Sequence, residues 1–71
     1  AATKAGIPDI ICCYKGRFIA IEVKRPETKN NVSRLQVANI TMIINAQGEA
    51  IVAWDKEMVK TFITNIDKEI T

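Results

Sequence analysis

Two acidic residues and one lysine lie at the ends of two apolar runs in the first third of the chain. Asp9 comes directly before the apolar residues 10–13, and Glu22 and Lys24 fall at the end of the apolar residues 18–23. Mg²⁺ takes oxygen ligands, one or two of them carboxylates, and keeps positions open for water or phosphate. A lysine beside such a site can orient or deprotonate the attacking water, or neutralise charge that builds on phosphorus. These residue types therefore favour metal-assisted hydrolysis of a phosphodiester.

The two apolar runs are expected to form a β-hairpin that brings the charged residues together. They are rich in Ile, Val, Phe and Cys and are separated by the polar residues 14–17, which predicts a four-residue loop. If Cys13 pairs with Phe18 across that loop, the register places Asp9 directly opposite Glu22. Side chains alternate along a strand, so Lys24 lies on the face of Glu22. Opposed carboxylates repel each other and weaken the pairing, so a bound cation is the expected compensation.

A solvated strand face is the ordinary alternative for the same residues. Glu-x-Lys alone should occur by chance in roughly one chain of this length in four. The whole arrangement is more specific, because Gly-Ile-Pro-Asp opens one strand and Glu-Val-Lys closes the next in matching register. The combination favours a site over a solvated face.

Residues 5–54 resemble the PD-(D/E)xK nuclease superfamily, and within it the virus-type replication-repair nuclease (VRR-NUC) domain. The likeness lies in GIPDII, GRFIAIEVKRP, SRLQ and a glycine-containing loop. It implies that Asp9 and Glu22 bind Mg²⁺, for which Mn²⁺ can substitute, and that the backbone carbonyl of Val23 adds a ligand. It also implies that Lys24 is the catalytic lysine and that Gln36 takes the family's glutamine position among the catalytic residues.

The same resemblance implies a Mg²⁺-dependent DNA endonuclease, structure-selective on branched DNA such as Holliday junctions or flaps. Members of the family commonly begin with a helix that carries another acidic residue near the metal, followed by a strand that leads into the Gly-x-Pro-Asp segment, whereas only residues 1–5 precede Gly6. The chain is therefore expected to be a fragment, to do without that helix, or to receive the missing layer from another chain. A non-catalytic nucleic-acid-binding or assembly module that keeps the fold is the alternative function.

Basic residues concentrate in the first half of the chain and point to DNA as the partner. Up to Arg34 there are seven basic residues against three acidic ones, while the remainder has three against five. With a metal on Asp9 and Glu22, that surface would be strongly positive, as contact with phosphates requires. The expected DNA contacts are Lys15, Arg17, Arg25, Lys29 and Arg34. A solvated face of common basic residues is the alternative.

The remainder of the chain predicts a loop, a helix, a strand and a second helix. Residues 27–31 are a polar loop, and Ser33 with Gln36 forms a capping box that starts a widely apolar, well-buried helix ending at Gly48. Gln36 is therefore a capping residue, a neighbour of the metal, or both. Residues 49–54 predict an interior strand parallel to a neighbour, and Asp55 caps a last helix with one apolar face.

Residues 1–71 thus predict a single α/β domain, a small mixed β-sheet flanked by helices in the order β-β-α-β-α, like a restriction-endonuclease core without its N-terminal helix. Cys12 and Cys13 should face opposite sides of their strand as buried apolar residues, and with no His and no further Cys a structural zinc site is excluded on ligand count. Three strands leave sheet edges and part of one face uncovered, so a second copy, in a homodimer or higher oligomer, or a missing N-terminal segment is expected to complete the core. The composition favours a soluble, intracellular protein with no membrane contact.

Overall fold

The computed structural model describes residues 7–28 and 30–70, and it confirms the predicted order of elements. The chain forms β1 (Ile10–Tyr14), β2 (Arg17–Val23), α1 (Arg34–Asn45), β3 (Glu49–Ala53) and α2 (Lys56–Ile70). One short 3₁₀ helix, η1 (Pro26–Thr28), lies where only a loop was expected. It closes because the Thr28 backbone N–H and hydroxyl both donate to the Arg25 carbonyl, at 2.9 and 3.2 Å.

The three strands form one mixed sheet in the order β1-β2-β3. β1 and β2 pair antiparallel, with Cys13 opposite Phe18 and Ile10 opposite Ile21, which is the predicted register. β2 and β3 pair in parallel, as the apolar composition of β3 predicted. The interior strand is β2, however, whereas β3 lies at one edge of the described sheet, so the expected interior position of β3 is wrong.

The hairpin turn is tighter than predicted. Tyr14 pairs with Arg17, so the connection is the two residues Lys15 and Gly16 instead of four. Both have positive φ, 50° for Lys15 and 82° for Gly16, which is the conformation of a type I′ turn. Tyr14 and Arg17 were assigned to the loop because they are polar, although both are strand residues.

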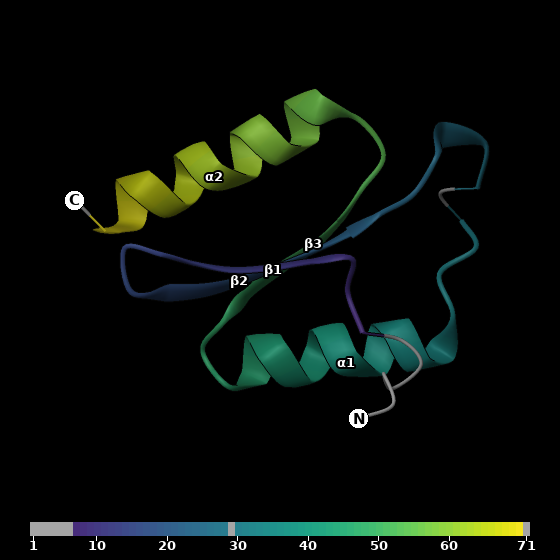
Figure 1. Ribbon diagram of the computed structural model, residues 1–71, viewed down its shortest axis with the longest axis horizontal. Helices are drawn as coiled ribbons and strands as arrows, with labels where there is room; N and C mark the ends of the chain where they lie inside the picture. The colour runs from purple at the N-terminus through teal and green to yellow at the C-terminus, as the bar shows by residue number, and fades with distance from the viewer. Residues whose placement is uncertain (1–6, 29, 71) are drawn as a thin grey trace.

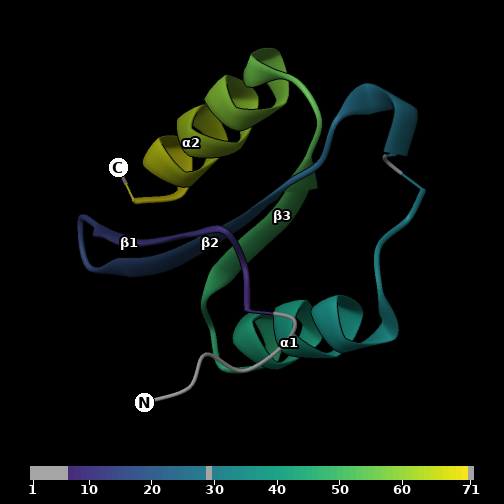
Figure 2. The ribbon, with the colours of Figure 1, turned by 45° about the vertical axis from the view of Figure 1, so that its right-hand side comes forward.

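The two helices lie on opposite faces of the sheet (Figure 1). The same arrangement is visible after rotation, with α2 above and α1 below the strands (Figure 2). The buried core lies between the sheet and α2, where Ile19, Ile21 and Ala53 meet Ile66. The other apolar residues of α2 pack around them, which confirms its predicted apolar face: Met58, Val59, Phe62, Ile63 and Ile70.

Helix α1 departs from its prediction in both burial and length. None of its residues is buried, and Met42 is 66% exposed, because the apolar arc of the helix is wider than the strip of sheet beneath it. The helix ends at Asn45, before Gly48, and Gln47 takes a left-handed conformation with φ 74°. Gly48 is needed for close approach, since a Cβ there would lie 2.8 Å from the Ile43 side chain.

Both cysteines of β1 are free and exposed, so the prediction that they are buried is wrong. Both helices pack against β3, and β1 lies at the opposite edge of the sheet. The faces of β1 are therefore less covered than those of β2. In residues 7–28 and 30–70, no helix has the length and apolar character needed to cross a membrane.

Candidate active site

Glu22 is a buried carboxylate on the central strand, and the candidate site is built around it. The residue is only 4% exposed, although it lies near the end of β2. Its side chain is on the α1 face of the sheet, since it meets Gln36 in the first turn of that helix. Burial of a carboxylate requires polar or charged partners. Those partners come from three separate segments of the chain.

Asp9 approaches Glu22 from the residue before β1. The last paired residues of the hairpin are Ile10 and Ile21, and Asp9 lies one position beyond them. There its Oδ2 accepts a hydrogen bond of 2.8 Å from the Val23 backbone N–H. The hairpin therefore places the two acids at the same end of the sheet, as its register predicted. The bond to Val23 was not foreseen, and it anchors Asp9 beside the site.

Burial raises the pKa of Glu22, and the negative charge of Asp9 raises the pKa of the Glu22 carboxyl further. The ammonium of Lys24 acts in the opposite direction. Glu22 Oε1 is buried and has no hydrogen-bond partner in the described structure. A buried oxygen without a partner is costly and needs a specific explanation. This carboxylate is thus short of positive charge.

Lys24 is on the same face as Glu22, as the alternation along the strand predicted. Its Nζ lies 3.7 Å from Glu22 Oε2, and the lysine side chain is 18% exposed. Its backbone N–H donates a 2.9 Å hydrogen bond to the Ala53 carbonyl, which continues the parallel pairing beyond the end of β2. The lysine therefore projects from an anchored backbone, and part of its side chain remains open to a ligand.

Gln36 forms the predicted capping box and also contacts Glu22 of the candidate site. Its Oε1 accepts a hydrogen bond of 3.0 Å from the Ser33 backbone N–H, while the Ser33 hydroxyl accepts one of 3.1 Å from the Gln36 backbone N–H, which confirms the capping box. Its Nε2 donates a hydrogen bond of 2.7 Å to Glu22 Oε2. The sequence reasoning missed this direct bond. The signal for it was the position of Gln36 in the first turn of a helix that packs on the sheet.

The donor set fits a hard divalent cation. Glu22 Oε1 lacks a partner, Asp9 is nearby, and the Val23 carbonyl lies between Glu22 and Lys24 in sequence. Among residues 7–28 and 30–70, no group of three or more His, Cys, Asp or Glu side chains gathers into a metal site. Two carboxylates and a backbone carbonyl are few protein ligands for a metal ion. Mg²⁺ is typically held by one or two carboxylates and several waters, so such a set is sufficient for it.

The basic residues expected to contact DNA divide into two groups. Lys15 and Arg17 lie at the hairpin turn, the opposite end of β2 from the site, where they pair with acidic residues. Arg25 follows the site directly and forms an exposed 3.5 Å pair with Glu27. Arg34 begins α1 and is also exposed. Lys29 lies outside the described residues.

The pairs at the turn fasten the hairpin to neighbouring elements. Lys15 Nζ lies 3.0 Å from Asp67 of α2, and Arg17 lies 2.7 Å from Glu49 of β3. The Tyr14 hydroxyl also donates to Asp67, at 2.8 Å. For Lys15 and Arg17, contact with a phosphate would compete with these bonds. The structure therefore brings Arg25 near the site but does not bring Lys15 or Arg17 there.

Comparison with known proteins identifies one family. The family model described as archaeal Holliday junction resolvase (hjc) matches residues 1–70. No curated protein and no solved structure matches the chain significantly.

Proposed function

Because the chain belongs to the archaeal Holliday junction resolvase family, a family of PD-(D/E)xK-type nucleases, we propose that it is a divalent-metal-dependent endonuclease that cleaves branched DNA. Membership of this family implies a nuclease acting on DNA and supports the predicted superfamily. The particular likeness to the VRR-NUC branch stays a prediction. The observation that carries the proposal is the buried Glu22 carboxylate, with one oxygen lacking a partner beside Asp9 and the other near Lys24.

Asp9, Glu22 and the Val23 carbonyl would hold the cation. A bound Mg²⁺, or Mn²⁺ in its place, supplies positive charge that polarises the scissile phosphate. Gln36 holds the Glu22 carboxylate through its 2.7 Å bond to Oε2, so Oε1, which lacks a partner, would be the oxygen that binds the cation. The bond from the Val23 N–H holds Asp9 Oδ2 in the same way. Each acid therefore has one oxygen held by a hydrogen bond from the protein.

Lys24 would act on the water or on the phosphate. Its ammonium is 3.7 Å from Glu22 Oε2, a separation that leaves its protons free to turn toward a ligand. An ammonium in that place can orient the attacking water and stabilise charge on the phosphoryl oxygens as it develops. The anchored backbone of Lys24 keeps this group at the carboxylates.

DNA would reach the site over Arg25 and Arg34, with Lys29 as a further predicted contact. Arg25 follows Lys24 by one residue, and Arg34 belongs to the same first turn of α1 as Gln36. Both lie next to residues of the site, so a phosphate backbone held by them would pass close to Glu22. The exposed pair of Arg25 with Glu27 is weak and easily exchanged for a phosphate.

The experiment compares cleavage of a four-way junction, a flap and a linear duplex of the same sequence, each with Mg²⁺, with Mn²⁺ and with EDTA. We expect metal-dependent products from the branched substrates, and their loss in Lys24→Ala. Lys60→Ala is the matched control, since Lys60 is an exposed lysine on α2, on the other face of the sheet. Products that form in EDTA, or a Lys24→Ala protein as active as wild type, would refute the proposal. Binding of junctions without cleavage under all conditions would favour a non-catalytic module instead.

A further inference from the structure

Two hydrogen bonds in series connect the N-cap of α1 to the candidate site through the side chain of Gln36. The Ser33 backbone N–H donates to Gln36 Oε1 at 3.0 Å, and Gln36 Nε2 donates to Glu22 Oε2 at 2.7 Å. The side-chain amide accepts through its oxygen and donates through its nitrogen. Ser33 offers it an N–H, and Glu22 offers it a carboxylate oxygen. The two neighbours of the amide are therefore complementary to a single orientation of the Gln36 side chain.

The reversed orientation of the Gln36 amide is mismatched at both ends. Turned over, Nε2 would face the Ser33 N–H, donor against donor, and Oε1 would face the buried Glu22 carboxylate, acceptor against acceptor. A polar group left without a partner beside a buried charge is costly. Without the Ser33 N–H, one end of the amide would have no partner, and the side chain could swing away from Glu22. The Ser33 N–H thus holds the amide at the carboxylate.

Ser33 is itself held in place at the start of α1. Its carbonyl accepts a 3.0 Å hydrogen bond from the Val37 N–H, and its hydroxyl accepts one of 3.1 Å from the Gln36 N–H. Its backbone has φ −69° and ψ 159°, the extended conformation that is usual for an N-cap residue. The N–H that reaches Gln36 Oε1 therefore projects from a backbone fixed by two further bonds.

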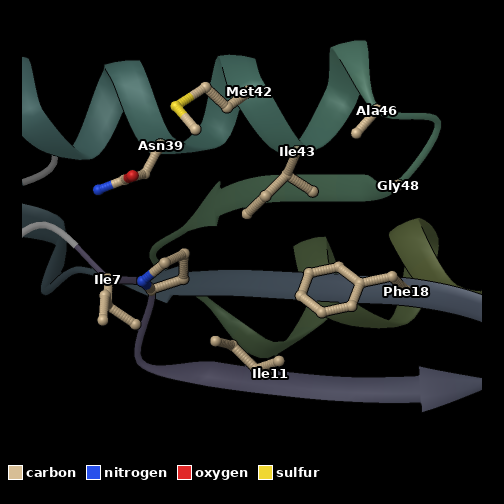
Figure 3. Close-up of a pocket in the computed structure, with 9 residues that line it drawn as sticks. Ile7, Ile11, Phe18, Asn39, Met42, Ile43, Ala46 and Gly48 are labelled. Carbon is tan, nitrogen blue, oxygen red and sulfur yellow. The ribbon is translucent and has the colours of Figure 1, made fainter. Parts of the chain in front are cut away.

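The loose packing of α1 makes this polar connection important for the site. None of the residues of α1 is buried, and an open apolar groove lies between the helix and the hairpin, with Met42 on one side and Phe18 on the other (Figure 3). Ile43, near the end of the helix, points toward the strands (Figure 3). At the start of the helix, the bond from Gln36 to Glu22 joins the first turn to β2.

We propose that the Ser33 backbone N–H is a positioning group of the active site. It holds the Gln36 amide with Nε2 toward Glu22 Oε2, and so keeps Glu22 Oε1, the oxygen without a partner, available to the cation. This inference rests on the proposed function for the task of Glu22. It also accounts for the residue type at position 36. A capping box accepts Glu as well as Gln there, but a glutamate would set a second carboxylate against Glu22.

Two substitutions of Ser33 isolate the N–H from the hydroxyl. Ser33→Ala and Ser33→Pro both lose the hydroxyl cap, but only the proline variant also lacks the N–H. The φ of −69° lies within the range of proline, and Val32 before it is outside any helix, so the backbone can accept the ring. Any difference between the two variants therefore reports the bond to Gln36 Oε1. Circular dichroism verifies that both keep the fold.

The first readout is the side-chain amide of Gln36 in ¹H–¹⁵N spectra of the metal-free protein in EDTA. Its signals are identified by their absence in Gln36→Glu, and the exposed Gln47 is the internal reference. A bond to a carboxylate is short and strong, so we expect the Gln36 signals well separated from those of Gln47 in wild type and Ser33→Ala. In Ser33→Pro they should move to the position of Gln47. Gln36 signals unchanged in folded Ser33→Pro would overturn the proposal.

The second readout is the Kd for Mg²⁺, obtained from the rise in melting temperature over a Mg²⁺ series. Loss of a group that orients a metal ligand typically weakens metal binding 10–100-fold, so Ser33→Pro should bind Mg²⁺ about tenfold more weakly than Ser33→Ala. Equal affinities of the two variants would contradict the positioning role. The spectra in EDTA do not depend on DNA cleavage. A wild type that cleaves branched DNA while Ser33→Pro matches Ser33→Ala would therefore refute this inference and leave the proposed function intact.

The variant Gln36→Glu decides the question if Ser33→Pro does not fold. It keeps an acceptor for the Ser33 N–H and adds an acid to the first turn of α1, which by helix energetics alone is neutral or stabilising. Next to Glu22, however, it replaces a donor by a second carboxylate. We expect Gln36→Glu to melt several degrees below wild type in EDTA at neutral pH. A melting temperature equal to or above that of wild type would show that Gln36 serves the cap alone, and would overturn the proposal.

Discussion

The substitution Asp9→Asn separates the structural task of Asp9 from its task as a metal ligand. Asparagine retains an oxygen that can accept the 2.8 Å bond from the Val23 N–H, but it removes the negative charge beside Glu22. Loss of the charge weakens that bond, because bonds to charged acceptors contribute about 1.5–3 kcal/mol against about 0.5–1.5 for neutral ones. It also relieves repulsion between opposed acids, worth roughly 0.2–1 kcal/mol. The two changes have opposite signs and similar size.

Without metal, therefore, wild type and Asp9→Asn should melt within a few degrees of each other. One kcal/mol shifts the melting temperature of a domain this small by about 4–8 °C. Mg²⁺ at about ten times its Kd should stabilise the wild type by roughly 1.4 kcal/mol through mass action, a rise of about 6–11 °C. An amide is a poorer Mg²⁺ ligand than a carboxylate, so the rise in the variant should be far smaller.

The assay is thermal unfolding followed by circular dichroism, with EDTA and with a Mg²⁺ series, for wild type, Asp9→Asn and Glu27→Gln. Glu27 is the matched control because it is an acid in the same basic half of the chain, but it pairs with Arg25 at the surface and not with the site. Glu27→Gln should show the full Mg²⁺ shift. If Mg²⁺ stabilises Asp9→Asn as much as wild type, or stabilises neither, then Asp9 and Glu22 do not share a cation and the proposed mechanism fails.

Three further predictions concern the residues around the site and the turn. Ser33→Ala removes only a helix cap and should lower the free energy of unfolding in urea by about 1 kcal/mol. Gln36→Ala also removes a bond to a charged acceptor and should cost roughly 1.5–3 kcal/mol more. Equal costs for the two variants would argue against the bond to the buried glutamate. The hydrogen bond from Lys15 lowers the pKa of Asp67 below its ordinary value of 3.8, so the stability contributed by Asp67 is present above pH 3.8 and is lost as pH falls through the lowered pKa. Asp67→Asn should flatten the acid limb of a stability profile, and an unchanged acid limb would contradict this assignment. Arg25→Ala should reduce the slope of log K for DNA binding against log salt by about 0.9, and an unchanged slope would exclude its contact with phosphate.

The register of the hairpin and the caps of both helices could be predicted because each depends on neighbouring residues. Alternation in residues 10–13 and 18–23 fixes which residues oppose each other, and the structure has that register. The Ser33 capping box and the Asp55 cap, which accepts a 2.9 Å bond from the Met58 N–H, are likewise local. The acids and the lysine of the candidate site were found in this way, since all of them lie near the ends of one hairpin.

Burial and partner choice could not be predicted, because they depend on which elements pack together. The apolar residues of α1 and the apolar character of Cys12 and Cys13 suggested burial. The helix and the two cysteines nevertheless lie where the described sheet and helices do not cover them. Lys15 and Arg17 looked like free basic residues until α2 and β3 brought Asp67 and Glu49 beside them. The bond from Gln36 to Glu22 depends in the same way on the placement of α1 against β2.

The position of Glu22 on the central strand has a consequence for motion during catalysis. Among the described strands, only β2 is hydrogen-bonded on both sides, to β1 and to β3, and parallel pairing continues from β2 through the Lys24 N–H. Segments held in this way open only when the whole fold opens, so the amide hydrogens of residues 19–24 should exchange with solvent as slowly as any in the chain. Arg25 and the 3₁₀ turn after it are held by a few local bonds and should exchange far faster. The segment that carries Arg25 can therefore move while the spacing between the backbones of Glu22 and Lys24 stays fixed.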